Sequence, residues 1–172
     1  MMIKGRGQRG FTLIELMISI ALLGVGTAFV IRMFMTSYQL WKRSFDEMLM
    51  QKDARLAMAR MVQIMREAKP GTTVISTSAT AGKFSQVSFQ DGRMRGWIFK
   101  QQGSKLYYVT ALADGTSVTQ FLGDNVETVV FSYPSFQDVS LIDIALTMKK
   151  TPYSKANPII VQLVERVMVR NP

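Results

Sequence analysis

The feature that most constrains the fold is an apolar run near the N-terminus. From Leu16 to Ile31 the chain reads LMISIALLGVGTAFVI, sixteen residues without a charged side chain. As a helix with ~1.5 Å rise per residue they span ~24 Å, less than the ~30 Å hydrocarbon core of a bilayer. Counted from Phe11, the run has 21 residues and spans ~31 Å, which is enough to cross if Glu15 is tolerated. The sequence therefore predicts a membrane-spanning helix with a carboxylate close to its start.

A basic segment precedes this run. Residues 1–10, MMIKGRGQRG, contain Lys4, Arg6 and Arg9 and no acidic residue. Basic residues before an apolar span favour a cytoplasmic start and export of the chain beyond the span. A cleaved secretory signal would need a shorter apolar core followed by a small-x-small site, whereas this run continues into further helix. We therefore expect the run to be kept as an anchor, with any processing ahead of it.

The helical pattern continues beyond the apolar run and becomes amphipathic. No proline occurs before Pro70, and Lys69, Pro70 and Gly71 mark a stop, so we expect one helix of roughly 55 residues. Its later apolar residues recur at steps of three and four, which is typical of a helix packed on a domain. They are Tyr38, Trp41, Phe45, Met48 and Leu49, and then Met50, Ala54, Ala57, Met61, Ile64 and Ala68. The aromatic positions indicate a core or an interfacial belt.

Beyond Pro70 the pattern changes to short alternating runs separated by turn residues, which predicts strands. Their close spacing leaves no room for crossover helices, so we expect an antiparallel sheet. The expected strands are 84–89, 97–100, 106–110, 126–133, 139–148 and 159–169. The rear half of the helix is expected to place its apolar face on this sheet.

The composition excludes several kinds of chemistry, because the chain has no cysteine and no histidine. A disulfide framework and a thiolate nucleophile are impossible, and the commonest general base and metal ligand are missing. The twelve carboxylates show no pair or cluster at a spacing typical of catalysis or metal binding. We therefore expect a structural protein rather than an enzyme, with no metal and no cofactor.

Basic residues outnumber acidic ones by nine, and three of them lie in the first ten residues, so the rest of the chain carries +6. Some of the remaining basic residues alternate with aromatic ones on predicted hairpins. The basic residues are Lys83, Arg93, Arg95, Lys100 and Lys105, with Phe84, Trp97, Tyr107 and Tyr108 among them. The mixture is compatible with binding of single-stranded nucleic acid. An ordinary sheet with one solvated face is the commoner explanation.

The junction Gly10-Phe11, followed by Thr12-Leu13-Ile14-Glu15 and the apolar run, closely resembles the N-terminal signature of type IV prepilins and type II secretion pseudopilins. The resemblance implies that a membrane-embedded prepilin peptidase cuts after Gly10 and methylates the new amino group of Phe11. It also implies that the mature subunit waits in the bacterial inner membrane with its globular part in the periplasm. From there it would enter a helical filament whose core is a bundle of N-terminal helices.

Two further observations concern the kind of subunit. The segments QKDARLAMARMVQIMREAKPG, NVETVVFSYPS, SLIDIALTMKK and VMVRN resemble J-type minor pseudopilins and W-type minor pilins. Major pilins commonly have a proline within the helix, where this chain has Arg32, and a C-terminal disulfide loop. Major pseudopilins usually carry an acidic calcium loop near the C-terminus, whereas the last forty residues here contain only Asp138, Asp143 and Glu165. The resemblance therefore favours a minor subunit.

Glu15 has two compatible interpretations. An acid at a helix start interacts with the positive end of the helix dipole, which contributes ~0.3–1 kcal/mol. The resemblance implies a second role, an ion pair with the methylated amino group of Phe11 on a neighbouring subunit. Only the second accounts for a carboxylate in lipid, where it costs a few kcal/mol on insertion scales. For Arg32, extension of the side chain to the membrane surface is favoured over an ion pair in the filament.

These observations predict an α+β, type IV pilin-like fold, with a long N-terminal helix packed on an antiparallel sheet. We expect a cytoplasmic leader (1–10), a transmembrane and filament-core helix (11–35), an amphipathic rear half (36–69) and a periplasmic sheet domain (70–172). The membrane-helix residues are Leu13, Ile14, Leu16, Ile18, Ile20, Leu22, Leu23, Val25, Phe29 and Ile31.

The function that the resemblance implies is that of a minor pilin or pseudopilin that helps to initiate or cap a type II secretion pseudopilus or a type IV pilus. The alternative is a minor pilin that binds DNA for uptake, or a surface for adhesion, through its basic, aromatic sheet face. The implied partners are prepilin peptidase, other pilin or pseudopilin subunits and the inner-membrane assembly platform. Nucleic acid is a less favoured partner.

Overall fold

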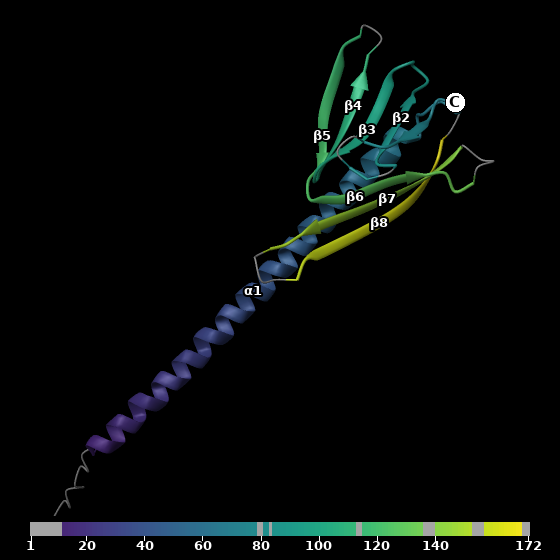
Figure 1. The fold of residues 1–172 in the computed structure, drawn as a ribbon. Coiled ribbons are helices and arrows are strands. Elements are labelled where there is room, and N and C mark those ends of the chain that lie inside the picture. Colours follow the sequence, from purple (N-terminus) through teal and green to yellow (C-terminus); the bar gives the residue numbers. More distant parts are fainter. Residues whose placement is uncertain are drawn as a thin grey trace, which may run out of the picture. The chain divides into compact units, whose positions relative to one another are not determined.

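The computed structural model describes residues 12–78, 81–82, 84–112, 115–135, 140–152 and 157–169. In these residues the chain forms one long helix followed by eight strands (Figure 1). Residue contacts divide the chain into two compact units, with the division between Ser44 and Phe45. Helix α1, Leu13–Met65, begins in the first unit and continues into the second. The finer boundaries expected from the sequence, at residues 35 and 69, stay predictions.

The rear part of α1 buries the face that its spacing predicts. All six positions of the later stripe, from Met50 to Ala68, are buried. The intervening basic residues Lys52, Arg55 and Arg60 are exposed. The earlier stripe does not enter the core of the structure, since Tyr38 is 57% exposed and Trp41 63%. Its assignment to a membrane-interfacial belt stays a prediction.

Helix α1 ends at Met65, four residues before the expected stop at Lys69. A 3₁₀-type turn follows the helix, in which Ala68 donates its backbone N–H to the carbonyl of Met65, three residues earlier, at 3.1 Å. Lys69 then donates its N–H to the carbonyl of Gln90 at 2.7 Å, which binds the chain to the end of strand 86–90. Gly71 adopts a φ of +77°, a conformation that glycine reaches without steric cost.

The eight strands form two sheets, and every neighbouring pair is antiparallel. The five-stranded sheet has the order β1-β2-β3-β4-β5 and the three-stranded sheet the order β6-β7-β8. The strands are β1 (Val74–Ser76), β2 (Gln86–Gln90), β3 (Gly96–Gln102), β4 (Lys105–Ala111), β5 (Ser117–Gly123), β6 (Val126–Ser132), β7 (Leu141–Lys150) and β8 (Ile159–Met168). The predicted combination of a long helix and antiparallel strands is confirmed, with two sheets in place of one.

The observed strands differ from the predicted ones at β1, at β5 and at Phe84. Strands β1 and β5 were not among them, because their sequences VIS and SVTQFLG lie within polar stretches next to turn residues. Phe84 was expected to begin a strand, but it has a φ of +60° and precedes β2. Its carbonyl accepts a hydrogen bond from the Phe131 N–H at 2.9 Å, and this contact with β6 holds the unusual backbone in place. The predicted strand start at Val139 lies outside the described residues.

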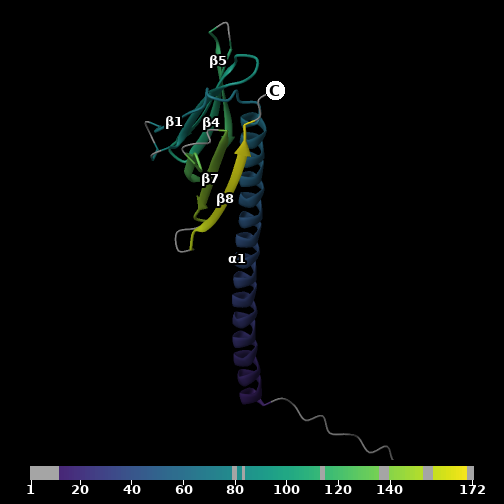
Figure 2. The ribbon, with the colours of Figure 1, turned by 90° about the vertical axis from the view of Figure 1, so that its right-hand side faces the viewer.

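One continuous core joins the rear part of α1 to the inner faces of both sheets. Strands β3 and β7 alternate buried and partly exposed residues, as expected for sheets with one covered face. Phe99 and Phe131 are fully buried and belong to different sheets. In Figure 2 the strands β7 and β8 lie to one side of the rear part of α1, with β8 running along it.

Candidate functional site

Glu15 lies in the first turn of α1, and Thr12 caps that turn. The Thr12 hydroxyl accepts a hydrogen bond from the Glu15 backbone N–H at 3.3 Å, and the Thr12 carbonyl accepts from the same N–H at 3.1 Å. A Thr three residues before a Glu is the spacing of a helix-capping pair, so Thr12 is a site residue that the FTLIE pattern alone did not single out. Within the described part of the chain the Glu15 carboxylate makes no ion pair.

The front of α1 is apolar on all sides. Its most hydrophobic window has a mean hydropathy of 2.2, and none of that window is buried. The helix is therefore long and apolar enough to cross a membrane. Every residue predicted for the membrane helix is exposed, from Leu16 and Ile18 at 55% to Leu13 at 77%. A helix that is apolar all round requires lipid or other helices around it.

The few polar side chains along this front part are satisfied within the helix itself. Ser19 and Thr27 each donate a hydroxyl hydrogen bond to the backbone carbonyl four residues earlier, both at 2.8 Å. Thr36 does the same to the carbonyl of Arg32 at 3.0 Å. Such bonds remove the cost of placing a free hydroxyl donor in an apolar medium. Glu15 is therefore the one charged group between Thr12 and Ile31.

A comparison with protein families finds a match over residues 5–31, to the family described as the prokaryotic N-terminal methylation motif. This match supports the predicted resemblance to type IV prepilins and pseudopilins. The motif and the apolar helix together indicate a structural subunit that is anchored in a membrane. No curated protein matches the chain.

Gly10 and Phe11, the predicted cleavage and methylation residues, lie outside the described residues but within the matched segment. Their roles follow from the motif and stay predictions for this chain. Arg32 is exposed on α1 one residue beyond the matched segment. Its predicted extension to the membrane surface likewise stays a prediction.

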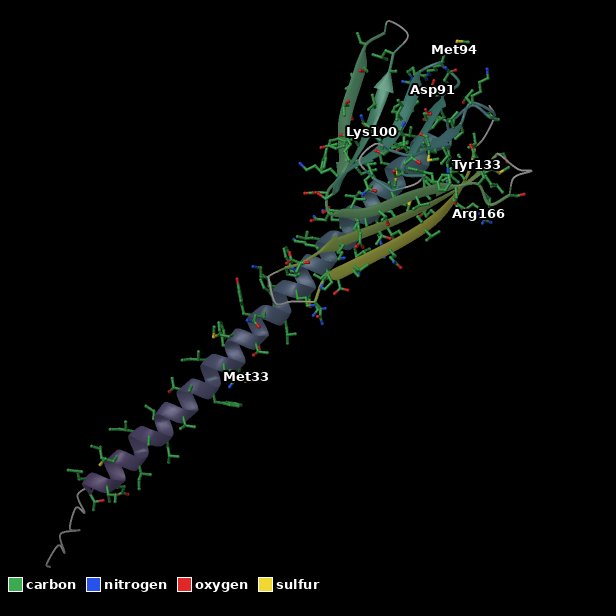
Figure 3. The ribbon with its side chains drawn as sticks, in the orientation of Figure 1. Met33, Asp91, Met94, Lys100, Tyr133 and Arg166 are labelled. Carbon is green, nitrogen blue, oxygen red and sulfur yellow. The ribbon has the colours of Figure 1, made fainter. Side chains whose placement is uncertain are left out.

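The basic residues proposed for nucleic-acid contact lie in different surroundings. Lys100 faces Tyr107 across the β3–β4 pair, and both side chains are partly exposed. Figure 3 shows Lys100 well away from the turn that contains Asp91 and Met94. Arg93 is exposed in that turn, Lys105 begins β4, and Lys83 lies outside the described residues.

Two members of the predicted basic, aromatic face point elsewhere. Arg95 donates to the Asp91 carboxylate at 2.7 Å, and its guanidinium carbon lies 5.5 Å from the centre of the Trp97 ring. Trp97 belongs to the core and is 9% exposed. The structure thus brings Lys100 beside Tyr107 without adding Arg95 or Trp97 to that face. The nucleic-acid interpretation stays a prediction.

Asp91, in the turn between β2 and β3, is 2% exposed and collects four hydrogen bonds. The donors are the backbone N–H groups of Arg93 and Arg95, the Arg95 guanidinium and the Trp97 indole. Burial alone would raise the pKa of Asp91, but these donors outweigh it and lower the pKa below its ordinary value of 3.8. No sequence motif pointed to this cluster, although Asp-Gly marked the turn.

In the described ranges, no group of three or more acidic side chains is placed to hold a metal ion. Asp143 pairs instead with Arg166 across β7 and β8, through two hydrogen bonds of 2.7 and 3.0 Å. The side-chain hydrogen bond from Arg166 lowers the pKa of Asp143 below its usual value. The candidate site of this chain is therefore the capped, apolar front of α1 with Glu15.

Proposed function

We propose that this chain is a minor pilin or pseudopilin that prepilin peptidase cuts after Gly10 and methylates on Phe11. The mature subunit is then anchored in the inner membrane, with its N-terminus cytoplasmic and its sheets in the periplasm. It helps to initiate or cap a type II secretion pseudopilus or a type IV pilus, together with other subunits and the inner-membrane assembly platform. The methylation motif and the exposed apolar front of α1 support this proposal.

The observation that carries the proposal is the position of Glu15. It stands in the first turn of α1, whose front part is apolar and exposed, and it forms no ion pair with the described residues. A carboxylate in that position costs a few kcal/mol in lipid, and a cation on another chain offsets that cost. The methylated amino group of a neighbouring subunit is such a cation. Pairing with it fixes how far the incoming helix advances along the filament.

The processing step has a direct test. Mass spectrometry of the chain purified from the membranes of a host with prepilin peptidase should show loss of residues 1–10 and one added methyl group. A Gly10→Val variant should keep its leader, because a branched side chain blocks close approach of the backbone to the peptidase. A mature chain that starts elsewhere, or lacks the methyl group, would contradict the processing part of the proposal.

The assembly step is tested by Glu15→Ala. We expect normal membrane insertion and normal processing, with a strong loss of incorporation into filaments. Incorporation is measured by oxidative disulfide crosslinking between one cysteine introduced into this chain, which has none of its own, and one introduced into a neighbouring subunit. Leu22→Ala, in the same exposed helix, is the matched control and should incorporate normally. If Glu15→Ala incorporates as well as Leu22→Ala does, the ion-pair role is wrong.

A further inference from the structure

Strand β8 forms an open edge of the three-stranded sheet. In the order β6-β7-β8 it pairs with β7 on one side, and no described strand pairs with the other side. Half of the backbone groups of an edge strand point away from its neighbour and can hydrogen-bond another chain. At ten residues β8 is long for an edge strand. It also runs along the rear part of α1 (Figure 2).

The other edges in the described part of the chain are shorter or partly covered. Strand β1 has three residues and β5 has seven. The edge of β6 contacts the other sheet, because the Phe131 N–H donates to the Phe84 carbonyl and the Val126 N–H to the Ser104 carbonyl, both at 2.9 Å. Proteins usually protect a long edge with prolines or charges. β8 contains no proline, and its two charged residues, Glu165 and Arg166, lie in its second half, so the edge of its first half stays available.

Three of the five residues on the outer face of β8 are apolar, and the other two are Gln162 and Arg166. Ile160, Val164 and Met168 lie on this face at every fourth residue and are 52%, 72% and 61% exposed. Arg166, which lies between the last two, forms a two-bond ion pair with Asp143 of the neighbouring strand. Figure 3 shows Arg166 on this edge of the sheet. A strand placed beside β8 would therefore meet apolar side chains and a charge that is already neutralised.

The helix side of the same edge is polar and basic. A groove of about 290 Å³ lies between Gln51 and Arg55 of α1 and residues 160–163 of β8. It shares Gln51 and Arg55 with a neighbouring hollow of about 460 Å³, which is also lined by Lys52. Met48 and Leu56 form apolar walls of that hollow and are 58% and 59% exposed.

The two cations beside the groove lack acidic partners. Across the described residues neither Lys52 nor Arg55 forms an ion pair, whereas Lys150 pairs with Asp46 at 2.9 Å. Glu165 lies further along β8 and lines neither hollow. The groove and the neighbouring hollow therefore offer the same occupant the open edge of β8 and two positive charges, Arg55 from both and Lys52 from the hollow.

We propose that the edge of β8 binds an extended segment of another protein, whose side chains alternate between apolar and acidic. The segment adds to the sheet as a fourth strand. Its apolar side chains cover Ile160 and Val164, and its carboxylates point to the helix side, toward Lys52 and Arg55. A second copy of β8 does not match this chemistry, because its only acid is Glu165. The proposal goes beyond the filament role and does not depend on it.

The test uses the full-length chain in detergent micelles and two fluorescent decapeptides, one alternating valine and glutamate and one alternating valine and lysine. Both favour extended structure and differ in charge alone. We expect the acidic peptide to bind at least tenfold more tightly than the basic one at low ionic strength. Hydrogen exchange measured by mass spectrometry should slow in residues 159–168 with the acidic peptide, and not in β5.

The double variant Lys52→Glu/Arg55→Glu separates binding from folding. Both residues are exposed, so the fold should persist, and the preference should reverse in favour of the basic peptide. A misfolded variant would lose both peptides and show faster exchange throughout. Equal affinity for the two peptides, an unchanged preference in the double variant, or protection of β5 instead of β8 would overturn the proposal. So would protection of β8 that rises with protein concentration in the absence of peptide, because it would identify a second copy as the occupant.

Discussion

Asp91 fixes the turn between β2 and β3 and connects it to the end of α1. Its carboxylate accepts hydrogen bonds from Arg95 and Trp97 side chains, and its backbone pairs with Ala68 just after the helix. The next backbone contact, from Lys69 to Gln90, fixes the same junction. One buried carboxylate thus orders both the hairpin and the helix end.

At this scale we predict the effect of Asp91→Asn. The amide keeps the shape but removes the charge that the Arg95 guanidinium meets at 2.7 Å, and leaves it only the longer contact with Glu67 at 3.9 Å, so the free energy of unfolding should fall by about 2–3 kcal/mol. Urea unfolding of the chain in detergent at pH 7 measures this loss. Asp143→Asn, at the more exposed pair with Arg166, is the control and should lose less than half as much. Equal losses would mean that the Asp91 cluster has no special role.

We also predict that Asp91 makes the free energy of unfolding depend on pH. Its pKa is lower in the folded chain than the ordinary 3.8, so its ionised form stabilises the fold. This contribution is complete above pH ~4 and is lost as the pH falls through the lower folded-state pKa. Between pH 5 and pH 3 the native chain should therefore lose stability more steeply than Asp91→Asn. Parallel curves for the two proteins would contradict the assignment.

At the scale of elements, the close approach of α1 to the five-stranded sheet depends on small residues. Ala54 and Ala57 are buried on the helix, and a Cβ added at Gly123 of β5 would lie 3.8 Å from the Ala57 Cβ. That distance is an ordinary contact, so the site has room for one methyl group and not for a branched side chain.

We therefore predict that Ala57→Leu lowers the free energy of unfolding by about 1–3 kcal/mol through overpacking. Gly123→Ala is the matched control from the facing strand and should change it by less than about 0.5 kcal/mol. Urea unfolding of both variants in detergent provides the measurement. A tolerated Ala57→Leu would show that the helix can move away from the sheet without cost.

How far sequence reasoning succeeds depends on the strength of each element's pattern. The six positions predicted for the rear face of α1 are all buried, because a 3–4 spacing over twenty residues admits one buried face, and Met58, Val62 and Met65 widen that face beyond the prediction. Strand β5 could not, since its first five residues are all exposed and it shows no buried alternation. The roles that FTLIE implies for Gly10, Phe11 and Glu15 stay predictions, whereas the Asp91 cluster could not be predicted, because it depends on donors that only the hairpin brings together.

For the whole molecule, the division into two sheets depends on contacts that no local pattern encodes. Gln101 of β3 is 4% exposed and reaches the other sheet, where its amide group donates to the Glu127 carbonyl at 3.1 Å and accepts from the Val129 N–H at 2.9 Å. The side-chain amide of Gln101 also donates a hydrogen bond to the Gly103 carbonyl at 2.8 Å. A glutamine in a strand carries no local sign of this role, because its partners on the other sheet are 25 or more residues away.

We predict that Gln101→Leu loosens one sheet from the other. The apolar side chain leaves the Val129 N–H and the Glu127 carbonyl without partners, which should cost about 1–3 kcal/mol. Hydrogen exchange should accelerate in β6 more than in β7. Gln101→Glu keeps the acceptor for Val129 but loses the donor, so its effect should depend on pH. Uniform acceleration across both sheets would indicate a general loss of fold instead.

The hydroxyl groups of Ser19, Thr27 and Thr36 have a consequence for movement of the helix between environments. Each is bonded to the backbone of its own helix, so a passage from lipid to a bundle of apolar helices breaks none of these bonds. Such a passage exchanges one apolar surrounding for another and is close to neutral in free energy along most of the span. Under the proposed function, the direction of the exchange is decided at the first turn, by whichever environment offers Glu15 a positive charge.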